Sequence, residues 1–508
     1  MSVTASTEST QSMSSAPAGE VLESLNPATG EVVGTYPVHD EEAVAEAVAR
    51  ARKAARWWSG LGFDERKNRL LAWKRTVVRR IDELARLMHA ETGKPTDDAR
   101  LETIGAIEHI DWAAKHARKV LGPRKVRTGP LAMNLAASVQ YQPLGVIGVI
   151  GPWNYPILTP VGSIAYALAA GNAVVFKPSE HSPGVGAWIA ETFAEAVPEE
   201  PVLQVVTGFG PTGAALCRSG VDKVAFTGST ATGKKVMATC AETLTPVIVE
   251  AGGKDAVIVA DDADIEAAAE AVAFGAMGNA GQTCVGIERA YVTEKVFDAF
   301  VDRVATIAAG IRVGAQEDAQ LGPITMPSQV EIIRKHITDA VERGGKAVVG
   351  GPESVRPPFV HPVVLTDVPE DSAAMTEETF GPTITINRVR DLEEAVAKAN
   401  ATRYGLGSAV YTRSTSKAME IARRLRSGMT SINSVQTYAM VGALPFGGLG
   451  DSGFGRIHGP DGLREFAAAK SIARQKYRMP LPLLSFARKP RHMKLVMWVV
   501  RLLHGRGR

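Results

Sequence analysis

The chain has 508 residues, of which 45% are hydrophobic and 22% are charged, and its formal net charge is +3. This composition is typical of a globular protein with a large core, and the length suits about three domains. The three cysteines exclude a disulfide scaffold and favour a reducing compartment. We therefore expect free thiols and a cytoplasmic location.

The chain begins with a segment that predicts no fold of its own. Residues 1–21 are rich in Ser, Thr and Ala and have neither the basic start nor the apolar core of a signal peptide, so we expect a disordered tail. The first clear element follows at residues 40–58, where Asp40 precedes a pattern typical of a capped helix.

Three apolar runs predict buried strands at residues 145–151, 173–176 and 223–226. Alanine-rich helical patterns alternate with them, which indicates an α/β fold with parallel sheets. Candidate binding residues follow each strand at its carboxyl end, where open α/β sheets bind ligands. They are Trp153 and Asn154, then Lys177 and Glu180, then Gly228, Ser229 and Gly233. Residues 22–131 and 150–251 are therefore predicted to form a nucleotide-binding domain.

The run from Gly228 to Lys234 matches a P-loop except at the motif's last position. A P-loop needs Ser or Thr there as a magnesium ligand, and this chain has Lys235. A P-loop nucleotide-binding protein is thus an alternative that lacks its metal ligand. A strand, a glycine turn and a helix N-terminus still suit a pyrophosphate, so we expect a dinucleotide and no metal ion.

Cys284 is the one cysteine placed like a nucleophile. It follows Gly278 and Gly281 on a loop after an alanine-rich helix, whereas Cys217 and Cys240 fall in helical stretches and are interpreted as buried structural residues. A further strand is predicted before that helix, at residues 256–259. We assign residues 252–430 to a catalytic domain.

Six motifs resemble, in their order, those of the aldehyde dehydrogenase superfamily, and the resemblance covers about residues 22–476. They are Pro152 to Pro156 (PWNYP), Phe226 to Ser229 (FTGS), Glu250 to Lys254 (EAGGK), Gly281 to Cys284 (GQTC), Glu378 to Pro382 (ETFGP) and Pro445 to Gly448 (PFGG). The resemblance implies a Rossmann-type nucleotide domain, an α/β catalytic domain and a small β oligomerisation arm, which we expect at residues 132–149 and 431–487. It also implies a homodimer or homotetramer.

The same resemblance implies a reaction in which a thiolate adds to an aldehyde and a hydride leaves for a nicotinamide. Cys284 matches the nucleophile, and Asn154 with the backbone N–H of Cys284 matches the oxyanion hole. Glu250 matches the general base that hydrolyses the thioester, which favours release of a free acid. A relative recruited as a binding or structural protein would more plausibly have lost Cys284 or Glu250.

The cofactor residues are also implied by position. Lys177 and Glu180 match the adenosine ribose site, and Ser229 with its flanking Gly228 and Gly233 matches the pyrophosphate site. Glu378 and Phe380 match the nicotinamide ribose and ring, and Trp153 is a further cofactor-binding residue. A carboxylate at Glu180 accepts hydrogen bonds from ribose hydroxyls and repels a 2′-phosphate. NAD is therefore expected rather than NADP.

The resemblance places five residues on the aldehyde tunnel, Tyr155, Thr159, Gly162, Gly278 and Phe446. Three of them, Thr159, Gly162 and Gly278, are smaller than is usual, which predicts a wide tunnel for a long-chain or aromatic apolar aldehyde. Succinic semialdehyde is the alternative, with Arg289 or another arginine as a replacement for the arginine that Gly278 cannot supply. A glutamate of several family members is Ile457 here, followed by His458, so we expect Glu250 to act alone.

The last 21 residues carry the positive charge of the chain. Residues 488–508 contain seven Lys or Arg and no acid, which leaves −4 for the rest. The apolar stretch at 495–503 is too short to span a membrane, which needs about 20 residues. It is predicted either to lie on an anionic membrane surface, the inner membrane, or to pack on a partner subunit. No nucleic-acid module is visible, and we expect no nucleic-acid partner.

Overall fold

The computed structural model describes residues 20–479 and 481–505, and it divides the chain into two compact units. The first contains residues up to 120 together with 143–467, and the second contains 121–142 and the residues from 468 onward. The predicted N-terminal tail lies outside the described residues, apart from Glu20 and Val21, and Val21 already begins a strand.

The first sheet has six strands in the order β19-β9-β8-β5-β6-β7, with neighbours parallel except at the edge strand β19. The strands are β5 (Val146–Ile150), β6 (Ala173–Lys177), β7 (Leu203–Val205), β8 (Lys223–Gly228), β9 (Val247–Ala251) and β19 (Gly453–Phe454). The predicted strands at 145–151, 173–176 and 223–226 are confirmed. All of β5 and β6 is buried, as their apolar composition requires.

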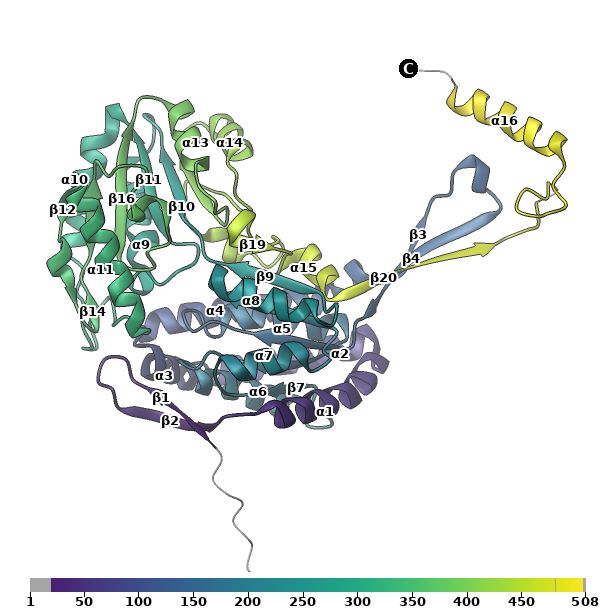
Figure 1. The fold of residues 1–508 in the computed structure, drawn as a ribbon, viewed down its shortest axis with the longest axis horizontal. Coiled ribbons are helices and arrows are strands. Elements are labelled where there is room, and N and C mark those ends of the chain that lie inside the picture. The colour runs from purple at the N-terminus through teal and green to yellow at the C-terminus, as the bar shows by residue number, and fades with distance from the viewer. Residues whose placement is uncertain (1–19, 480, 506–508) are drawn as a thin grey trace, which may run out of the picture. The chain divides into compact units, whose positions relative to one another are not determined.

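Helices cover both faces of this sheet (Figure 1). One face packs against α1 (Glu41–Gly60), α7 (Gly210–Arg218) and α8 (Thr230–Ala241). The other packs against α5 (Leu158–Ala170) and α6 (Pro183–Ala196), with α2 (Gly62–Arg79), α3 (Ile81–Thr92), α4 (Thr96–Leu121), α15 (Gly459–Glu465) and the hairpin of β1 (Val21–Leu25) and β2 (Val32–Pro37) in the same half. Asp40 caps α1 through Ala43 N at 2.9 Å, as predicted.

The second sheet has seven strands in the order β12-β15-β16-β11-β10-β17-β18, parallel except for β12. Its strands are β10 (Asp255–Val259), β11 (Ile287–Thr293), β12 (Lys346–Val349), β15 (Val363–Thr366), β16 (Thr383–Val389), β17 (Ser408–Tyr411) and β18 (Ser431–Ile432). Its helices are α9 (Ile265–Met277), α10 (Phe297–Ala309), α11 (Pro327–Glu342), α12 (Ala373–Thr376), α13 (Leu392–Asn400) and α14 (Thr415–Arg424).

Short elements complete the first unit. They are the strand pair β13 (Val355–Arg356) and β14 (Phe359–Val360) and the 3₁₀ turns η2 (Gly278–Gly281), η3 (Glu294–Val296), η4 (Pro352–Ser354), η5 (Thr437–Met440) and η6 (Gly450–Ser452). Cys217 in α7 and Cys240 in α8 are both buried, in keeping with a structural role.

The second unit is a three-stranded sheet followed by a helix. Its elements are β3 (Arg124–Val126), η1 (Pro130–Ala132), β4 (Leu135–Pro143), β20 (Ala467–Gln475) and α16 (Pro490–His504), with strand order β20-β4-β3. Most of β20 and all of β3 are exposed. None of the helices in the described part of the chain has the length and apolar character needed to cross a membrane.

The observed boundaries differ from the predicted arm at residues 132–149 and 431–487. The second unit already begins at Leu121, while residues 143–149 belong to the first unit because β5 is buried between two neighbouring strands. Residues 431–467 also belong to the first unit, since β18 and β19 extend its two sheets.

Candidate active site

The predicted polar residues lie along one edge of the first sheet. From β5 the chain proceeds to β6 on one side, while β8 lies on the other side. The boundary between β5 and β8 is therefore the switch point at which open α/β sheets bind ligands. Asn154 follows β5, Ser229 follows β8, and Glu250 lies in β9.

Cys284 ends a loop with a special backbone. Within η2, Asn279 and Ala280 have φ angles of 55° and 54°. Gly281 has a φ of 71°, and a Cβ there would overlap the carbonyl of Gly381. Both facts restrict position 281 to glycine. The cysteine loop is thus pressed against the loop that contains Gly381.

Asn154 is bonded to this loop. Its Nδ2 donates to the Gln282 carbonyl at 2.9 Å, and its own carbonyl accepts from Asn279 Nδ2 at 3.1 Å. Gln282 is itself fixed, because its Oε1 accepts from Thr325 N at 2.8 Å. The Asn154 amide has a second N–H, which therefore remains available to an oxygen close to the cysteine loop.

A buried ion pair that we did not predict supports Asn154. Lys94 pairs with Glu102, and its Nζ also donates to the Asn154 carbonyl at 2.9 Å. Glu102 accepts the N–H groups of Ile157 and Leu158, at 3.0 and 3.1 Å, where α5 begins. Removing either charge would leave the other buried without a partner. In the sequence, nothing in their spacing separates these residues from a solvated helix face.

Cys284 and Glu250 line one cavity of about 320 Å³. Burial, with Glu250 and Glu378 nearby, raises the pKa of the Cys284 thiol well above its ordinary value. Burial, and then Asp255, raises the pKa of Glu250 to about 8. Neither Glu250 oxygen has a hydrogen-bond partner among the described residues. Near neutral pH the Cys284 thiol and the Glu250 carboxyl are therefore both protonated in this form of the site. Cys284 must lose its proton to react as a nucleophile, and Glu250 must lose its proton to react as a base.

Four of the five residues predicted for the aldehyde tunnel line this cavity, and one does not. Tyr155, Thr159, Gly278 and Phe446 line the cavity. Gly162 does not, because the imidazole of His458 fills the space where a Cβ at Gly162 would lie. The small residue at 162 therefore makes room for His458, which we did not place in the wall, and leaves the tunnel no wider there.

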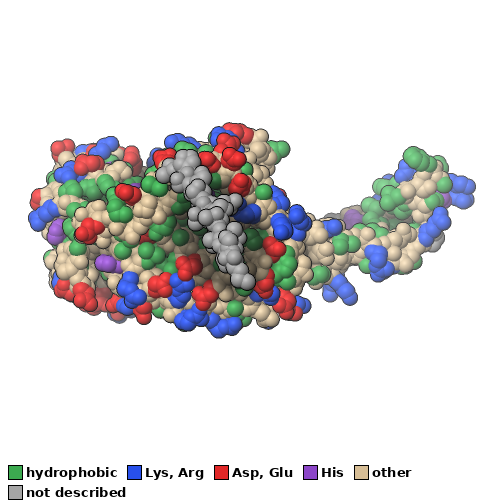
Figure 2. All heavy atoms as spheres, turned by 90° about the horizontal axis from the view of Figure 1, so that it is seen from below, with side chains coloured by type: hydrophobic (Ala, Val, Ile, Leu, Met, Phe, Trp, Pro, Cys, Tyr) green, Lys and Arg blue, Asp and Glu red, His purple; other side chains and the backbone are tan. Residues whose placement is uncertain are grey.

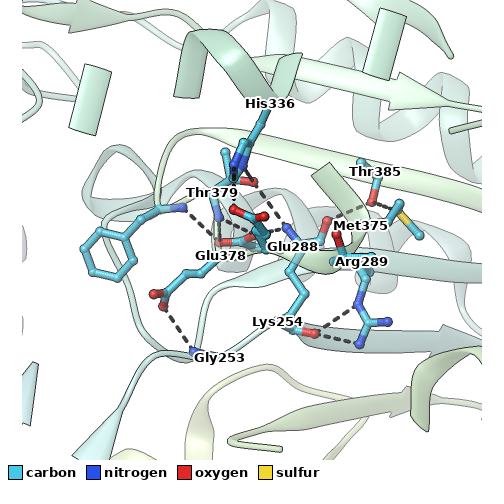
Figure 3. A network of polar contacts seen from close by, with 12 residues as sticks. Gly253, Lys254, Glu288, Arg289, His336, Met375, Glu378, Thr379 and Thr385 are labelled. Atoms are coloured by element: carbon cyan, nitrogen blue, oxygen red, sulfur yellow. Dashed lines mark hydrogen bonds and ion pairs between the residues drawn. The ribbon is translucent and has the colours of Figure 1, made fainter. Parts of the chain in front are cut away.

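Glu378 and Thr379 lie on a loop held by a second unpredicted network (Figure 3). Glu288 in β11 accepts the N–H groups of Thr379 and Phe380, each at 3.0 Å, and pairs with Lys254. Lys254 also donates to Thr379 Oγ1 at 3.2 Å. Phe380 has a φ of 53°, so the loop turns sharply here. In the sequence, this network could have been suspected from Glu288, because a charged residue inside an apolar strand pattern needs a buried partner.

Two further contacts involve residues that are predicted to bind the cofactor. Glu378 Oε1 accepts from Gly253 N at 3.1 Å, and Gly252 leaves room for this carboxylate, which any Cβ there would overlap. The rings of Trp153 and Phe380 meet edge to face at 5.7 Å.

The residues predicted for the pyrophosphate and the ribose lie at or after the carboxyl ends of β8 and β6. Ser229 caps α8, whose first turn offers N–H groups for a pyrophosphate, and Gly233 lets the helix approach Val249 closely. Lys177 is buried at the end of β6, 3.8 Å from the carboxylate of the half-exposed Glu180.

Arg289 is not in the cavity. Its guanidinium is buried and donates to the carbonyls of Lys254, at 2.7 and 3.0 Å, and of Ala399 at 3.1 Å. The expectation that it replaces an arginine of the aldehyde site is therefore wrong, because β11 directs it into the framework. Among the described residues that line the cavity there is no arginine.

Known proteins match this chain over most of its length. Residues 14–472 match the aldehyde dehydrogenase family. A 4,4'-diapolycopene aldehyde oxidase of Methylomonas sp is 36% identical over 90% of this chain and 87% of its own, and a glutarate-semialdehyde dehydrogenase of Pseudomonas putida is 36% identical over 89% and 94%. The crystal structure of an NAD-dependent aldehyde dehydrogenase from Sinorhizobium meliloti superposes with a TM-score of 0.87 at 33% identity, covering 92% of this chain and 94% of that one.

The shared length and identity carry more weight than any single motif. The six-stranded sheet with its switch point, the cysteine loop and the carboxylate of β9 occur together with 36% identity over nine-tenths of the chain. The P-loop alternative is dropped, because the glycine turn before α8 belongs to this larger pattern. The chain belongs to the aldehyde dehydrogenase family.

Proposed function

We propose that the protein oxidises an aldehyde to its carboxylic acid with NAD, through a thiohemiacetal and a thioester on Cys284. The observation that carries this proposal is that Cys284 and Glu250 line one cavity, with Asn154 bonded into the cysteine loop. Bound NAD would supply the hydride acceptor. The groups that would hold NAD are the backbone N–H groups at the N-terminus of α8, the side chain of Lys177 and the loop that contains Glu378.

In the proposed mechanism, the thiol of Cys284 gives its proton to solvent water, and its sulfur adds to the aldehyde carbon. The resulting oxyanion receives hydrogen bonds from the free N–H of Asn154 Nδ2 and the backbone N–H of Cys284, and one such donor is typically worth about 3 kcal/mol. After hydride loss leaves a thioester, Glu250 takes a proton from water, and the attack of that water releases the acid. A panel of aldehydes assayed by NADH absorbance tests this function, and a panel without turnover would contradict it.

We infer that NAD is preferred to NADP. Members of the family use either dinucleotide. In this chain the carboxylate of Glu180 lies at the end of β6, where it would meet a 2′-phosphate with like charge. The expected result is a higher kcat/KM with NAD, and exchange of Glu180 for Ala should narrow the difference. A wild-type preference for NADP would contradict this inference.

We infer a substrate with a long or aromatic apolar chain. The cavity wall includes Leu158, Val285 and Phe446, and its rim includes three exposed side chains, Leu101, Phe274 and Met440. Such a rim can receive the part of a hydrocarbon chain that extends beyond the cavity. The relative named for diapolycopene aldehyde is in keeping with a long apolar substrate. Chain-length profiling tests this, and a maximum kcat/KM at two or three carbons would contradict it.

A dicarboxylic semialdehyde is the second candidate, because of the relative named for glutarate semialdehyde. Among the described residues that line the cavity, Lys94 is the one Lys or Arg, and its charge is paired with Glu102. The carboxylate of Asp98 also lines the wall. A distal carboxylate would therefore meet no unpaired cation. We rank succinic and glutaric semialdehyde below apolar aldehydes of the same length, and the same assay compares them.

We propose that the β3-β4-β20 sheet joins subunits into a dimer or tetramer. Val126 and Ile472 are exposed on strands of this sheet, and such a small sheet gains stability by covering its apolar side chains. Light scattering after size exclusion measures the assembly. A monomer at micromolar concentration would contradict the proposal.

We also propose that α16 lies on an anionic membrane surface, at the cytoplasmic side of the inner membrane. Trp498 and Leu502 are 62% and 53% exposed, and the chain from 477 to its end contains no Asp or Glu. Figure 2 shows hydrophobic and basic side chains together at the end of the second unit, at the right of the view. This helix lies outside residues 14–472, which match the family. Hydrophobic and basic residues of this kind favour anionic interfaces.

Vesicle sedimentation tests the membrane proposal. The full chain should pellet with vesicles containing phosphatidylglycerol but not with pure phosphatidylcholine, and a chain without residues 480–508 should stay in the supernatant. The double variant Trp498→Ser, Leu502→Ser keeps the charges and should pellet poorly. Equal pelleting of the deleted chain, with a broken oligomer, would assign α16 to the partner subunit instead.

A further inference from the structure

His458 combines backbone strain with unmet hydrogen bonds. Its φ and ψ are 62° and 164°, a region that glycine alone occupies readily. Its side chain is buried, with 3% of the residue exposed, and neither ring nitrogen has a hydrogen-bond partner among the described residues. Strain and unsatisfied polar groups of this kind concentrate at functional positions.

The imidazole is fixed from two sides. Its Nε2 edge meets Gly162, where any Cβ would overlap it. Its face stacks on His109, with ring centroids 3.6 Å apart and planes inclined by 24°. His109 cannot withdraw easily, because its Nε2 donates to the Ala439 carbonyl at 2.9 Å. A substrate that needs more width therefore cannot push the His458 ring aside without breaking this arrangement.

The imidazole is also uncharged at ordinary pH. Burial, together with the neighbouring His109, lowers the pKa of His458 well below its ordinary value. Burial likewise lowers the pKa of His109 to about 4. A neutral ring among Phe446 and Ile457 leaves the wall suitable for an apolar chain. What the ring contributes to the cavity is therefore volume.

We propose that His458 is a specificity-determining residue that sets the width of the aldehyde cavity by filling the space left by Gly162. The inference rests on the proposed function and narrows its substrate class. A cavity closed by a rigid ring at this point accepts an unbranched chain and rejects one branched beside the carbonyl.

Two eight-carbon isomers, octanal and 2-ethylhexanal, test the proposal through the ratio of their kcat/KM values. His458→Ala empties the space and should lower the octanal preference about tenfold, a typical effect of a small change in pocket volume. His458→Phe restores a ring of similar size without hydrogen-bonding groups, and its ratio should stay within about threefold of wild type. His116→Ala, which removes an imidazole stacked on Trp112 outside the cavity wall, is the matched control.

A second variant acts from the opposite side. Gly162→Ala places a methyl group where the His458 ring lies, so the ring must move toward the cavity and the octanal preference should rise. An unchanged ratio in both His458→Ala and Gly162→Ala, or an equal fall in His458→Phe and His458→Ala, would overturn the proposal. A wild-type protein that forms no NADH from any aldehyde would instead overturn the proposed function.

Discussion

Two polar regions of this molecule are built in opposite ways. Under the loop of Glu378 and Phe380, Glu288 accepts two backbone N–H groups and pairs with Lys254, so its charge is compensated. At the reaction end, Glu250 is just as deeply buried but neither of its oxygens has a partner among the described residues. The first region is a framework in which every bond fixes a position, and the second keeps its bonding capacity for water and substrate.

Removing the nucleophile should produce the largest effect. Cys284→Ala should lower NADH formation by about 10⁴-fold or more, because no other described thiol lines the cavity. NAD binding, measured by calorimetry, should persist, since the framework is intact. Cys217→Ala in α7 is the control that removes a thiol without touching the site. Substantial activity in Cys284→Ala would refute the mechanism.

Removing the base should affect only the second half of the reaction. Glu250→Gln should lower steady-state turnover by about 10²- to 10⁴-fold, while the first turnover still produces a burst of NADH in stopped flow. Because the base works when ionised, the wild-type rate should rise with pH through about 8, the pKa to which burial raises Glu250. A variant that loses the burst as well would place Glu250 before hydride transfer.

Breaking the framework should instead affect stability. Glu288→Gln leaves the Lys254 charge buried without its partner and should cost about 3 kcal/mol in the free energy of unfolding. Glu294→Gln is the matched control, because Glu294 pairs with Arg388 at 3.7 Å on the surface and should change stability by less than about 0.5 kcal/mol. Denaturant unfolding of both variants measures the difference, and equal effects would contradict the contrast between the regions.

The smallest effect concerns stability and pH at the reaction end. The pKa of Glu250 in the folded state lies above its ordinary value, so the folded protein binds an extra proton and loses stability as pH rises toward about 8. Glu250→Gln lacks this loss. Its stability relative to wild type should therefore increase by about 1 kcal/mol per pH unit between about pH 6 and pH 7. Parallel curves for the two proteins would show that Glu250 is ionised when folded.

The sequence was sufficient for residues whose role follows from strand ends and motif order. The strands at 145–151, 173–176 and 223–226 were predictable because buried parallel strands are continuous apolar runs. Cys284, Glu250, Tyr155 and Phe446 were found at one cavity because motifs in family order fold to one place.

What was missed depends on contacts between distant segments. Lys94 and Glu102 resemble a solvated helix face until α5 covers them. Gly162 predicted empty space, but His458, 296 positions later, fills it. The sequence alone allowed the side chain of Arg289 to point into the cavity. The register of β11 against β10 instead directs it to the carbonyl of Lys254. The identity of a single residue therefore predicted which residues lie at the cavity better than it predicted the width of the cavity.

The close contact between Gly281 and the Gly381 carbonyl couples the loop of the nucleophile to the loop of Glu378 and Phe380. Any side chain at 281 would wedge the loop of the nucleophile away from the loop of Glu378 and Phe380. At this point the loop of Cys284 and the loop of Glu378 and Phe380 meet through backbone atoms. A variant designed to bind the cofactor differently must therefore exchange only the side chains at 378 and 380. The backbone of both loops must keep its course.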